Sequence, residues 1–339
     1  MAKEHVGRKI VYFLGAGASV GAGAVATVQA GGIIAIPTQS DFWQVFLRFS
    51  RGTGNRKTID RFLFHYFLGY AKVPSRLRAP ERRRLLAGVD VEEVFTFLSE
   101  RVRAPSTSPS LRGYVKQVWD ALVEEIGGVF SRFDSNVSTK AVYRQMLKKH
   151  LRSRDAVVSF NYDDVFERSM PTPRRWAYEG LEDCQGRLRI IKPHGSVGWK
   201  EIDGRVSMGT REDAVVVAPT HLKFVATADG KSIPILQGYL DQSPQFGDIW
   251  SAMEDQMKQA KALVFIGYSF PVADLYFSSL LRSVLADRTR SPGLVLVNPD
   301  AVAIAQRLRA RFAVAEPVRL FDLRQFIGMT RKQILDLFQ

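Results

Sequence analysis

The sequence predicts an α/β fold of the Rossmann-like, doubly wound class, with a mainly parallel sheet and a helical insert. Strand-type runs repeatedly end in glycine-rich or polar turns, and helix-period stretches between the later runs would supply right-handed crossovers. The chain has 339 residues, of which 46% are hydrophobic. Such a chain is longer than one Rossmann-type unit needs, so a large insert or second subdomain is expected.

The expected strands of the sheet are runs of aliphatic and aromatic residues. In chain order they cover residues 9–14, 156–160, 188–192, 215–217, 262–266, 294–297 and 318–321. Crossover helices are expected near residues 248–259, 273–285 and 301–311. Residues 1–37 and 155–339 would together form the α/β domain.

Residues 38–154 are expected to form the insert, because this region has little strand alternation. Helix-period stretches fall at 42–49, 59–70, 91–98, 114–130 and 142–151, with linkers at 74–80 and 104–110. The insert is basic. It holds 22 Lys and Arg against 11 Asp and Glu, a net charge of +11 within a whole-chain charge of +14.

The densest positive charge in the insert is the cluster Arg76, Arg78, Arg82, Arg83 and Arg84. Such a face is typical of a surface that meets nucleic acid, an acidic partner or an anionic substrate. A solvated face without any ligand is the alternative interpretation. The charge alone does not choose between these four.

Four turns follow four of the expected strands and bring polar residues to one sheet edge. They contain Gly15, Ala16, Gly17 and Ser19; Asn161 and Asp163; His194; and Gly267 and Ser269. Ligands of open α/β sheets bind at the carboxyl ends of the strands. Each turn alone also fits a tight turn or a helix cap, so the prediction of a site depends on all four together.

The residue types at this edge favour a dinucleotide. A Gly-x-Gly-x-Ser turn lets main-chain N–H groups and a hydroxyl approach a pyrophosphate. Asn161 can hold a ribose hydroxyl or a water, and Asp163 can accept a hydrogen bond from a carboxamide. His194 is the candidate base, because imidazole exchanges a proton near neutral pH.

Several enzyme classes are disfavoured by what the motifs lack. Val20 stands where the dehydrogenase fingerprint has its third glycine, and no Gly-x-Ser-x-Gly elbow of a serine hydrolase occurs. Cys184 is the only cysteine, and no cluster of His, Cys and Asp has the spacing of metal ligands. No metal site is therefore expected.

The order of these motifs resembles the sirtuin family. A Gly-Ala-Gly-x-Ser loop, an Asn-x-Asp motif, a His-Gly motif and a Gly-x-Ser strand end appear in that order, followed by a late strand ending in Asn298. The resemblance covers roughly the first 37 residues and those from about 155 onward. It implies that NAD is bound as a substrate and that Asn161 and His194 act at the nicotinamide ribose. It also implies that Asp163 holds the carboxamide and Asn298 the adenosine ribose, and it places the pyrophosphate on Gly15, Ala16, Gly17, Ser19, Gly267 and Ser269.

The sequence departs from the sirtuin pattern at two places, and these departures indicate which group of the family it resembles most. Protein-deacylating sirtuins carry a zinc module held by two cysteine pairs, which one cysteine cannot build, so no zinc is expected. The family's Asp-Phe-Arg after the first loop is replaced by Asp41-Phe42-Trp43. The chain looks most like the sirtuin-like NADases of bacterial anti-phage defence systems. This implies an NAD hydrolase (NAD⁺ nucleosidase) that gives nicotinamide and ADP-ribose and serves as a defence effector.

Other functions remain open at this point. They are an NAD-dependent protein deacylase or ADP-ribosyltransferase, a non-catalytic NAD or ADP-ribose sensor, and a nucleic-acid-binding module. Residues 10–40 carry no charge, but their six glycines favour a buried loop over a membrane span, and the start lacks the apolar core of a signal peptide. We therefore expect a cytoplasmic protein. Toxic NAD hydrolysis must be restrained, so a homo-oligomer or a partner defence protein such as an ATPase is also expected.

Overall fold

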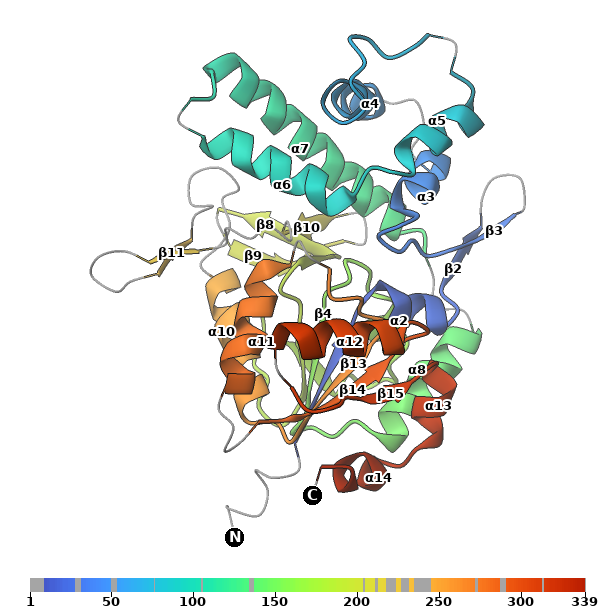
Figure 1. Cartoon of the computed structure of the whole chain (residues 1–339), viewed down its shortest axis with the longest axis vertical. Coiled ribbons are helices and arrows are strands. Elements are labelled where there is room, and N and C mark those ends of the chain that lie inside the picture. The colour runs from blue at the N-terminus through green and yellow to red at the C-terminus, as the bar shows by residue number, and fades with distance from the viewer. Residues whose placement is uncertain are drawn as a thin grey trace.

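A computed structural model describes most of the chain. The core of the protein is one parallel sheet. The described residues are 9–27, 32–49, 54–75, 77–104, 106–133, 137–203, 205–210, 213–217, 224–226, 232–234, 245–271, 274–286, 291–312 and 314–338. A layer of helices lies across one end of the sheet domain (Figure 1). None of the described helices combines the length and the apolar character that crossing a membrane requires.

The central sheet has seven strands in the order β15-β14-β13-β1-β4-β6-β5, and every neighbouring pair is parallel. Its strands are β1 (Ile10–Leu14), β4 (Ala156–Ser159), β5 (Trp176–Tyr178), β6 (Leu188–Ile191), β13 (Ala262–Ile266), β14 (Gly293–Val297) and β15 (Val318–Leu320). The inner strands are apolar at nearly every position because both faces of the sheet are covered. The predicted fold class is confirmed.

Strand β1 lies at the topological switch point of this sheet. From β1 the chain builds outward through β4 and β6 on one side, and through β13, β14 and β15 on the other. The loops that leave β1, β4 and β13 therefore diverge at their carboxyl ends. Such a divergence opens the crevice in which doubly wound sheets bind ligands.

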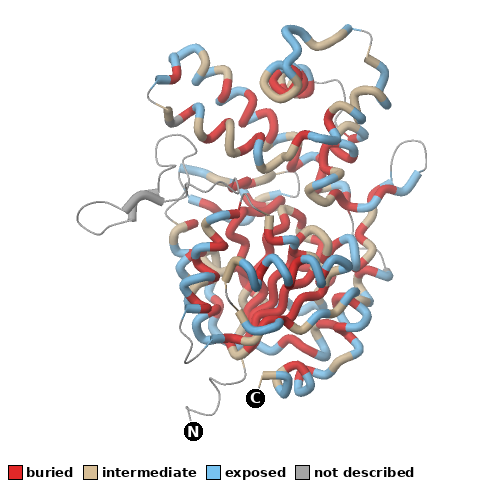
Figure 2. Tube along the Cα trace, viewed as in Figure 1, coloured by how far each residue is buried: buried red, intermediate tan, exposed pale blue. Residues whose placement is uncertain are grey.

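The three expected crossover helices are present, as α10 (Gln245–Lys258), α11 (Leu275–Ala286) and α12 (Ala301–Phe312). They lie around the sheet together with α2 (Ala16–Gly21), α13 (Leu323–Gly328) and α14 (Arg331–Asp336) (Figure 1). A further short helix, α9 (Val165–Arg168), follows β4 in the chain. Buried residues concentrate in the sheet and on the helix sides that face it (Figure 2).

One expected strand of the main sheet lies elsewhere. Strand β10 (Ala214–Val216) pairs antiparallel with β7 (Gly195–Val197) in a separate two-stranded sheet. The cause is Gly195, whose φ is +81° and whose backbone approaches Val215 so closely that a Cβ would lie 2.0 Å from the Val215 carbonyl oxygen. The seventh strand of the main sheet is β5, which was not among the expected strands.

Three short hairpins complete the described strands. They are formed by β2 (Val25–Thr27) with β3 (Ile33–Ala35), β8 (Trp199–Ile202) with β9 (Arg205–Met208), and β11 (Phe224–Ala226) with β12 (Ser232–Pro234).

The region predicted to be helical is helical. It contains α3 (Phe42–Phe49), α4 (Gly54–Tyr66), α5 (Ala79–Leu86), α6 (Val91–Arg103), α7 (Pro109–Phe130) and α8 (Val137–Lys149). Helices α3 to α7 form the layer over the carboxyl edge of the sheet, whereas α8 packs beside α9 and α13 (Figure 1). Helix α5 was not expected, because its first turn falls in the predicted linker.

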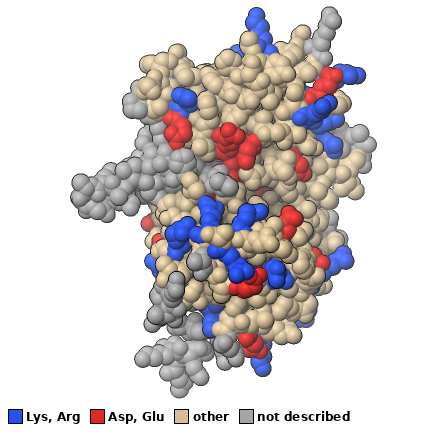
Figure 3. All heavy atoms as spheres, viewed as in Figure 1, with Lys and Arg blue, Asp and Glu red and all other residues tan. Residues whose placement is uncertain are grey.

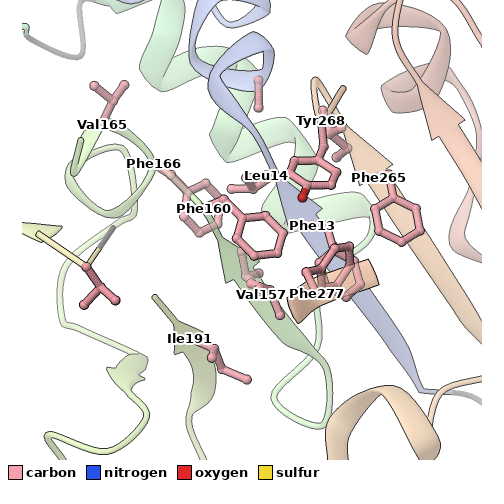
Figure 4. Close-up of a cluster of buried hydrophobic side chains, with 14 of the residues drawn as sticks. Phe13, Leu14, Val157, Phe160, Val165, Phe166, Ile191, Phe265, Tyr268 and Phe277 are labelled. Atoms are coloured by element: carbon pink, nitrogen blue, oxygen red, sulfur yellow. The ribbon is translucent and has the colours of Figure 1, made fainter. Parts of the chain in front are cut away.

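Packed aromatic rings form the core directly beneath the carboxyl edge. Phe160 lies 4.7 Å from Tyr268 and 5.0 Å from Phe277, and Phe13 lies 4.5 Å from Phe265, measured between ring centroids. Figure 4 shows these rings gathered where β1, β4 and β13 end. The loops that follow these strands therefore rest on a close-packed apolar floor.

Candidate functional site

A cavity of about 1130 Å³ opens where the sheet edge meets the helical layer. Its volume suits an extended ligand as large as a dinucleotide. Nine of the ten site residues expected from the sequence line this one cavity, and only Ser19 does not. The nine are Gly15, Ala16, Gly17, Asn161, Asp163, His194, Gly267, Ser269 and Asn298.

The three glycines at the cavity floor allow two loops to touch. A Cβ on Gly15 would lie 2.5 Å from the Gly267 carbonyl oxygen, and one on Gly267 would lie 2.1 Å from the nitrogen of Ala18. The N–H groups of Gly15 and Gly17 donate to the carbonyls of Ile266 and Gly267, at 3.0 Å each. These glycines are therefore required by the close approach of the two loops, in addition to facing the cavity.

Asn161 is fixed by its amide nitrogen. That nitrogen donates to the Gly15 carbonyl at 3.0 Å and lies 3.4 Å from the Ser19 hydroxyl oxygen. Asn161 lines the cavity, and among the described residues none donates to its side-chain oxygen. The geometry thus leaves an acceptor for a ribose hydroxyl or a water.

Ser19 and Asp163 bind each other. The Ser19 hydroxyl lies 3.1 and 3.2 Å from the two carboxylate oxygens of Asp163, and the Val165 N–H donates to the same carboxylate at 3.0 Å. Burial raises the pKa of Asp163 to about 6, although Lys192 opposes this shift. Ser19 therefore acts within the structure by joining the first loop to the Asn-x-Asp motif.

Lys192 joins the Asn-x-Asp motif to the loop that carries His194. Its ammonium group is fully buried and donates to the Asp163 carbonyl at 2.6 Å and to the Glu167 carboxylate at 3.1 Å. Because a buried charge needs such partners, Lys192 fixes the spacing of the two loops. The sequence analysis assigned no role to Lys192, which it placed only at the end of the expected strand 188–192.

His194 lies in the cavity wall among aromatic rings and one carboxylate. Its ring centroid is 5.1 Å from that of Phe160 and 5.9 Å from that of Trp250, and its main-chain carbonyl accepts from the Val217 N–H at 2.8 Å. Its Nε2 lies 3.8 Å from Oδ2 of Asp274. Asp274 also lines the cavity and was not predicted, since no motif surrounds it.

The helical layer contributes acidic residues to the same cavity. Asp90 caps α6 by accepting from the Glu92 N–H at 2.8 Å, and it also accepts two hydrogen bonds from the side chain of Gln39. Glu92 lines the cavity. Burial is the main cause that raises the pKa values of Tyr162 and Tyr268, and the charge of Glu92 adds to both shifts. Glu92, Tyr162 and Tyr268 line the same cavity.

Asn298 also lines the cavity. This side chain accepts from the Asp300 N–H at 2.9 Å and donates to the Tyr268 carbonyl at 3.5 Å, which places it at the start of α12. Ser269 is exposed, and its carbonyl accepts from Arg307 at 3.0 Å. Asn298 is thus held between the ends of β13 and β14.

Part of the arginine cluster in the helical layer is neutralised internally. Arg82 pairs with Asp60 at 2.6 Å, and Arg78 pairs with Glu81 at 2.8 Å, while Arg76 lies outside the described residues. On the face shown in Figure 3, Lys and Arg side chains also gather over α12. The described residues contain no group of three or more His, Cys, Asp or Glu placed to hold a metal ion.

We compared the chain with known proteins by sequence and by structure. No curated protein matches this chain. Three solved structures of mutant Sir2 homologues, each a complex with ADP-ribose, align at 14 to 15% identity with TM-scores of 0.37 to 0.41. The alignments cover 97 to 99% of this chain and 93 to 98% of theirs. Residues 155–319, just under half of the chain, match the family model of the SIR2-like domain, and this segment carries Asn161, His194 and Asn298.

Proposed function

We propose that this protein cleaves the nicotinamide–ribose bond of NAD and releases nicotinamide and ADP-ribose. The observation that supports this most is that Asn161 and His194 line one cavity with the glycine turns at Gly15 and Gly267. Asn161 and His194 can act on a ribose, and the two turns, which have no side chain at their glycines, leave room for a pyrophosphate against the backbone. The match of residues 155–319 to the SIR2-like domain supports the same ligand.

Each residue has a role in this proposal. The side-chain oxygen of Asn161 accepts a hydrogen bond from a ribose hydroxyl or from the attacking water. His194 removes a proton as water adds to the ribose carbon. The bond to the nicotinamide nitrogen breaks, and nicotinamide leaves as a neutral molecule with the bonding electron pair. The pyrophosphate lies along Gly15, Gly17 and Gly267, and Asn298 contacts the adenosine ribose.

The test measures nicotinamide by chromatography after incubation with NAD. We expect Asn161→Ala and His194→Ala each to lower turnover by about a hundredfold or more, as for groups acting at the bond being broken. Asn55→Ala and His65→Ala, in the helical layer away from the cavity lining, serve as matched controls. Melting temperatures are recorded for all four variants. Wild-type turnover in both cavity variants would remove Asn161 and His194 from the reaction.

The same assay separates the alternatives. Release of nicotinamide only in the presence of an acyl-lysine peptide would indicate a deacylase, and transfer of labelled ADP-ribose to protein would indicate a transferase. Binding of NAD without release would indicate a sensor. We favour the hydrolase because Cys184 alone cannot hold the structural zinc of deacylating sirtuins.

We propose that the biological role is that of an effector in anti-phage defence, acting in the cytoplasm. The resemblance of the motif set and of its departures to the sirtuin-like NADases of such systems supports this role. A hydrolase of NAD must be inactive in a healthy cell, so activation through a homo-oligomer or through a partner such as an ATPase is part of the proposal.

A further inference from the structure

Three buried side chains that line the cavity form a chain of contacts. The Tyr268 hydroxyl donates to Oδ2 of Asp274 at 2.8 Å, and the same Oδ2 lies 3.8 Å from Nε2 of His194. Exposed fractions are 6% for Tyr268, 1% for Asp274 and 5% for His194. The three residues come from the loop after β13, the start of α11 and the loop after β6.

The carboxylate of Asp274 has a fixed position. Its Oδ1 accepts from the Phe277 N–H at 3.4 Å at the start of α11, while Tyr268 holds Oδ2. Burial, together with the charge of Asp274, raises the pKa of Tyr268 well above 10, so the phenol remains a donor. Asp274 therefore cannot turn away from His194 without losing the hydrogen bonds from Tyr268 and Phe277.

The surroundings of His194 explain why such an anion is needed. The imidazole lies near the rings of Phe160 and Trp250, where a positive charge is poorly solvated. A base that takes up a proton becomes an imidazolium ion. A carboxylate at about 4 Å in a buried site offsets much of the cost of that charge.

We propose that Asp274 is a positioning residue that orients the His194 ring and stabilises its protonated form, and that Tyr268 fixes Asp274 for this task. This rests on the proposed function, in which His194 removes a proton. The 3.8 Å separation shortens to a charge-assisted hydrogen bond when His194 is protonated. The remaining ionisable groups of the cavity lining are Asp90, Glu92, Tyr162, Asp163, Asp300, Asp322 and Arg324.

The first experiment follows the titration of the His194 ring by NMR in the full chain, with the signal identified by its loss in His194→Ala. In Asp274→Asn the titration midpoint is expected to fall by about one pH unit, because the imidazolium loses its anionic neighbour. Asp255→Asn, a change on the exposed side of α10, is the matched control and should leave the midpoint unchanged. An unchanged midpoint in Asp274→Asn would overturn the inference.

The second experiment measures NAD cleavage against pH. Asp274→Asn is expected to lower kcat on the order of a hundredfold with less than about a threefold change in KM, and to move the acid limb of the profile to lower pH. Tyr268→Phe should act in the same direction with a smaller effect, and it covers the case in which Asp274→Asn does not fold. A fall in kcat without movement of the acid limb in either variant would make Asp274 merely structural. If wild-type protein does not cleave NAD, the proposed function fails, while the NMR titration still decides the pairing.

Discussion

Replacing Lys192 by Met should destabilise the protein strongly. The side chain of Lys192 has no exposed surface, and its ammonium group contacts the main-chain carbonyl of Asp163 and the carboxylate of Glu167. The side chain of Glu167 is only 3% exposed. Met fills much of the same volume but supplies no charge. The variant therefore leaves the carboxylates of Asp163 and Glu167 buried without their cation.

The expected cost follows from this burial. Removing one partner of a buried ion pair typically costs about 3–5 kcal/mol. That is a large part of a folding free energy of about 5–15 kcal/mol. The additional change Glu167→Gln removes one stranded charge and should recover part of the loss, which a double-mutant cycle measures.

Urea unfolding followed by circular dichroism provides the assay, with Lys258→Met as the matched control. Lys258 pairs with Glu254 at 2.8 Å on the surface of α10, where its side chain is 53% exposed. An exposed pair of this kind contributes less than about 1 kcal/mol. If Lys192→Met costs no more than Lys258→Met, the argument that the buried ammonium holds the two loops together is refuted.

Two further predictions concern Asp163 and the basic helices. Burial raises the pKa of Asp163 from 3.8 to about 6, so the folded state keeps this proton to higher pH than the unfolded state does. The contribution of Asp163 to stability therefore falls as pH rises, by about 2 kcal/mol between pH 4 and pH 6. Asp163→Asn removes this dependence of the unfolding free energy on pH, so the difference in unfolding free energy between wild type and variant must change between pH 4 and pH 6. A difference that stays constant over this range would contradict the raised pKa of Asp163. If the arginines of α5 contact nucleic acid, the double variant Arg83→Gln, Arg84→Gln should flatten the slope of log affinity against log salt by up to about two units, measured by fluorescence anisotropy with duplex DNA. An unchanged slope assigns them to a solvated surface.

Arg82 is left out of that variant for a structural reason. Its guanidinium group contacts Asp60 at 2.6 Å, and the side chain of Asp60 is only 8% exposed. Changing Arg82 would therefore mix a loss of stability with any loss of binding. The linear order of the arginines gave no sign of this difference between Arg82 and its neighbours.

The strands next to the site could be predicted because their hydrophobicity is continuous. Strands β1, β4 and β13 are buried on both faces, so each is an uninterrupted apolar run closed by a glycine or a polar residue. Parallel pairing then places their ends at one edge. This is why nine residues chosen from separate turns line one cavity.

Elements defined by contacts far along the chain were harder to predict. Strand β5 has three residues, Trp176–Tyr178, and is a strand because it pairs with β6 at the sheet edge. Residues 214–216 have strand character, but their partner is set by the sharp turn at Gly195 rather than by their own sequence. Local propensity identifies a strand without identifying its neighbour. Helix α5 was not predicted because residues 74–80 were expected to form a linker, whereas Pro80 occupies the first turn of the helix, where proline is tolerated.

Contacts between distant parts of the chain also decide the residues of the candidate site that were not predicted. These residues are charged, and no sequence motif surrounds them. Asp274 precedes a helix and resembles any helix cap, and Glu92 resembles any acidic residue in a first helical turn. Folding brings Asp274 to within 3.8 Å of His194 and brings Glu92, from the helical layer, into the lining of the same cavity. The glycine and Asn-His motifs thus specify where a ligand can lie, whereas the charges around the reacting end depend on tertiary packing. Glu92 lies on α6, so the helical layer supplies one of these charges to the cavity that Tyr162 and Tyr268 also line.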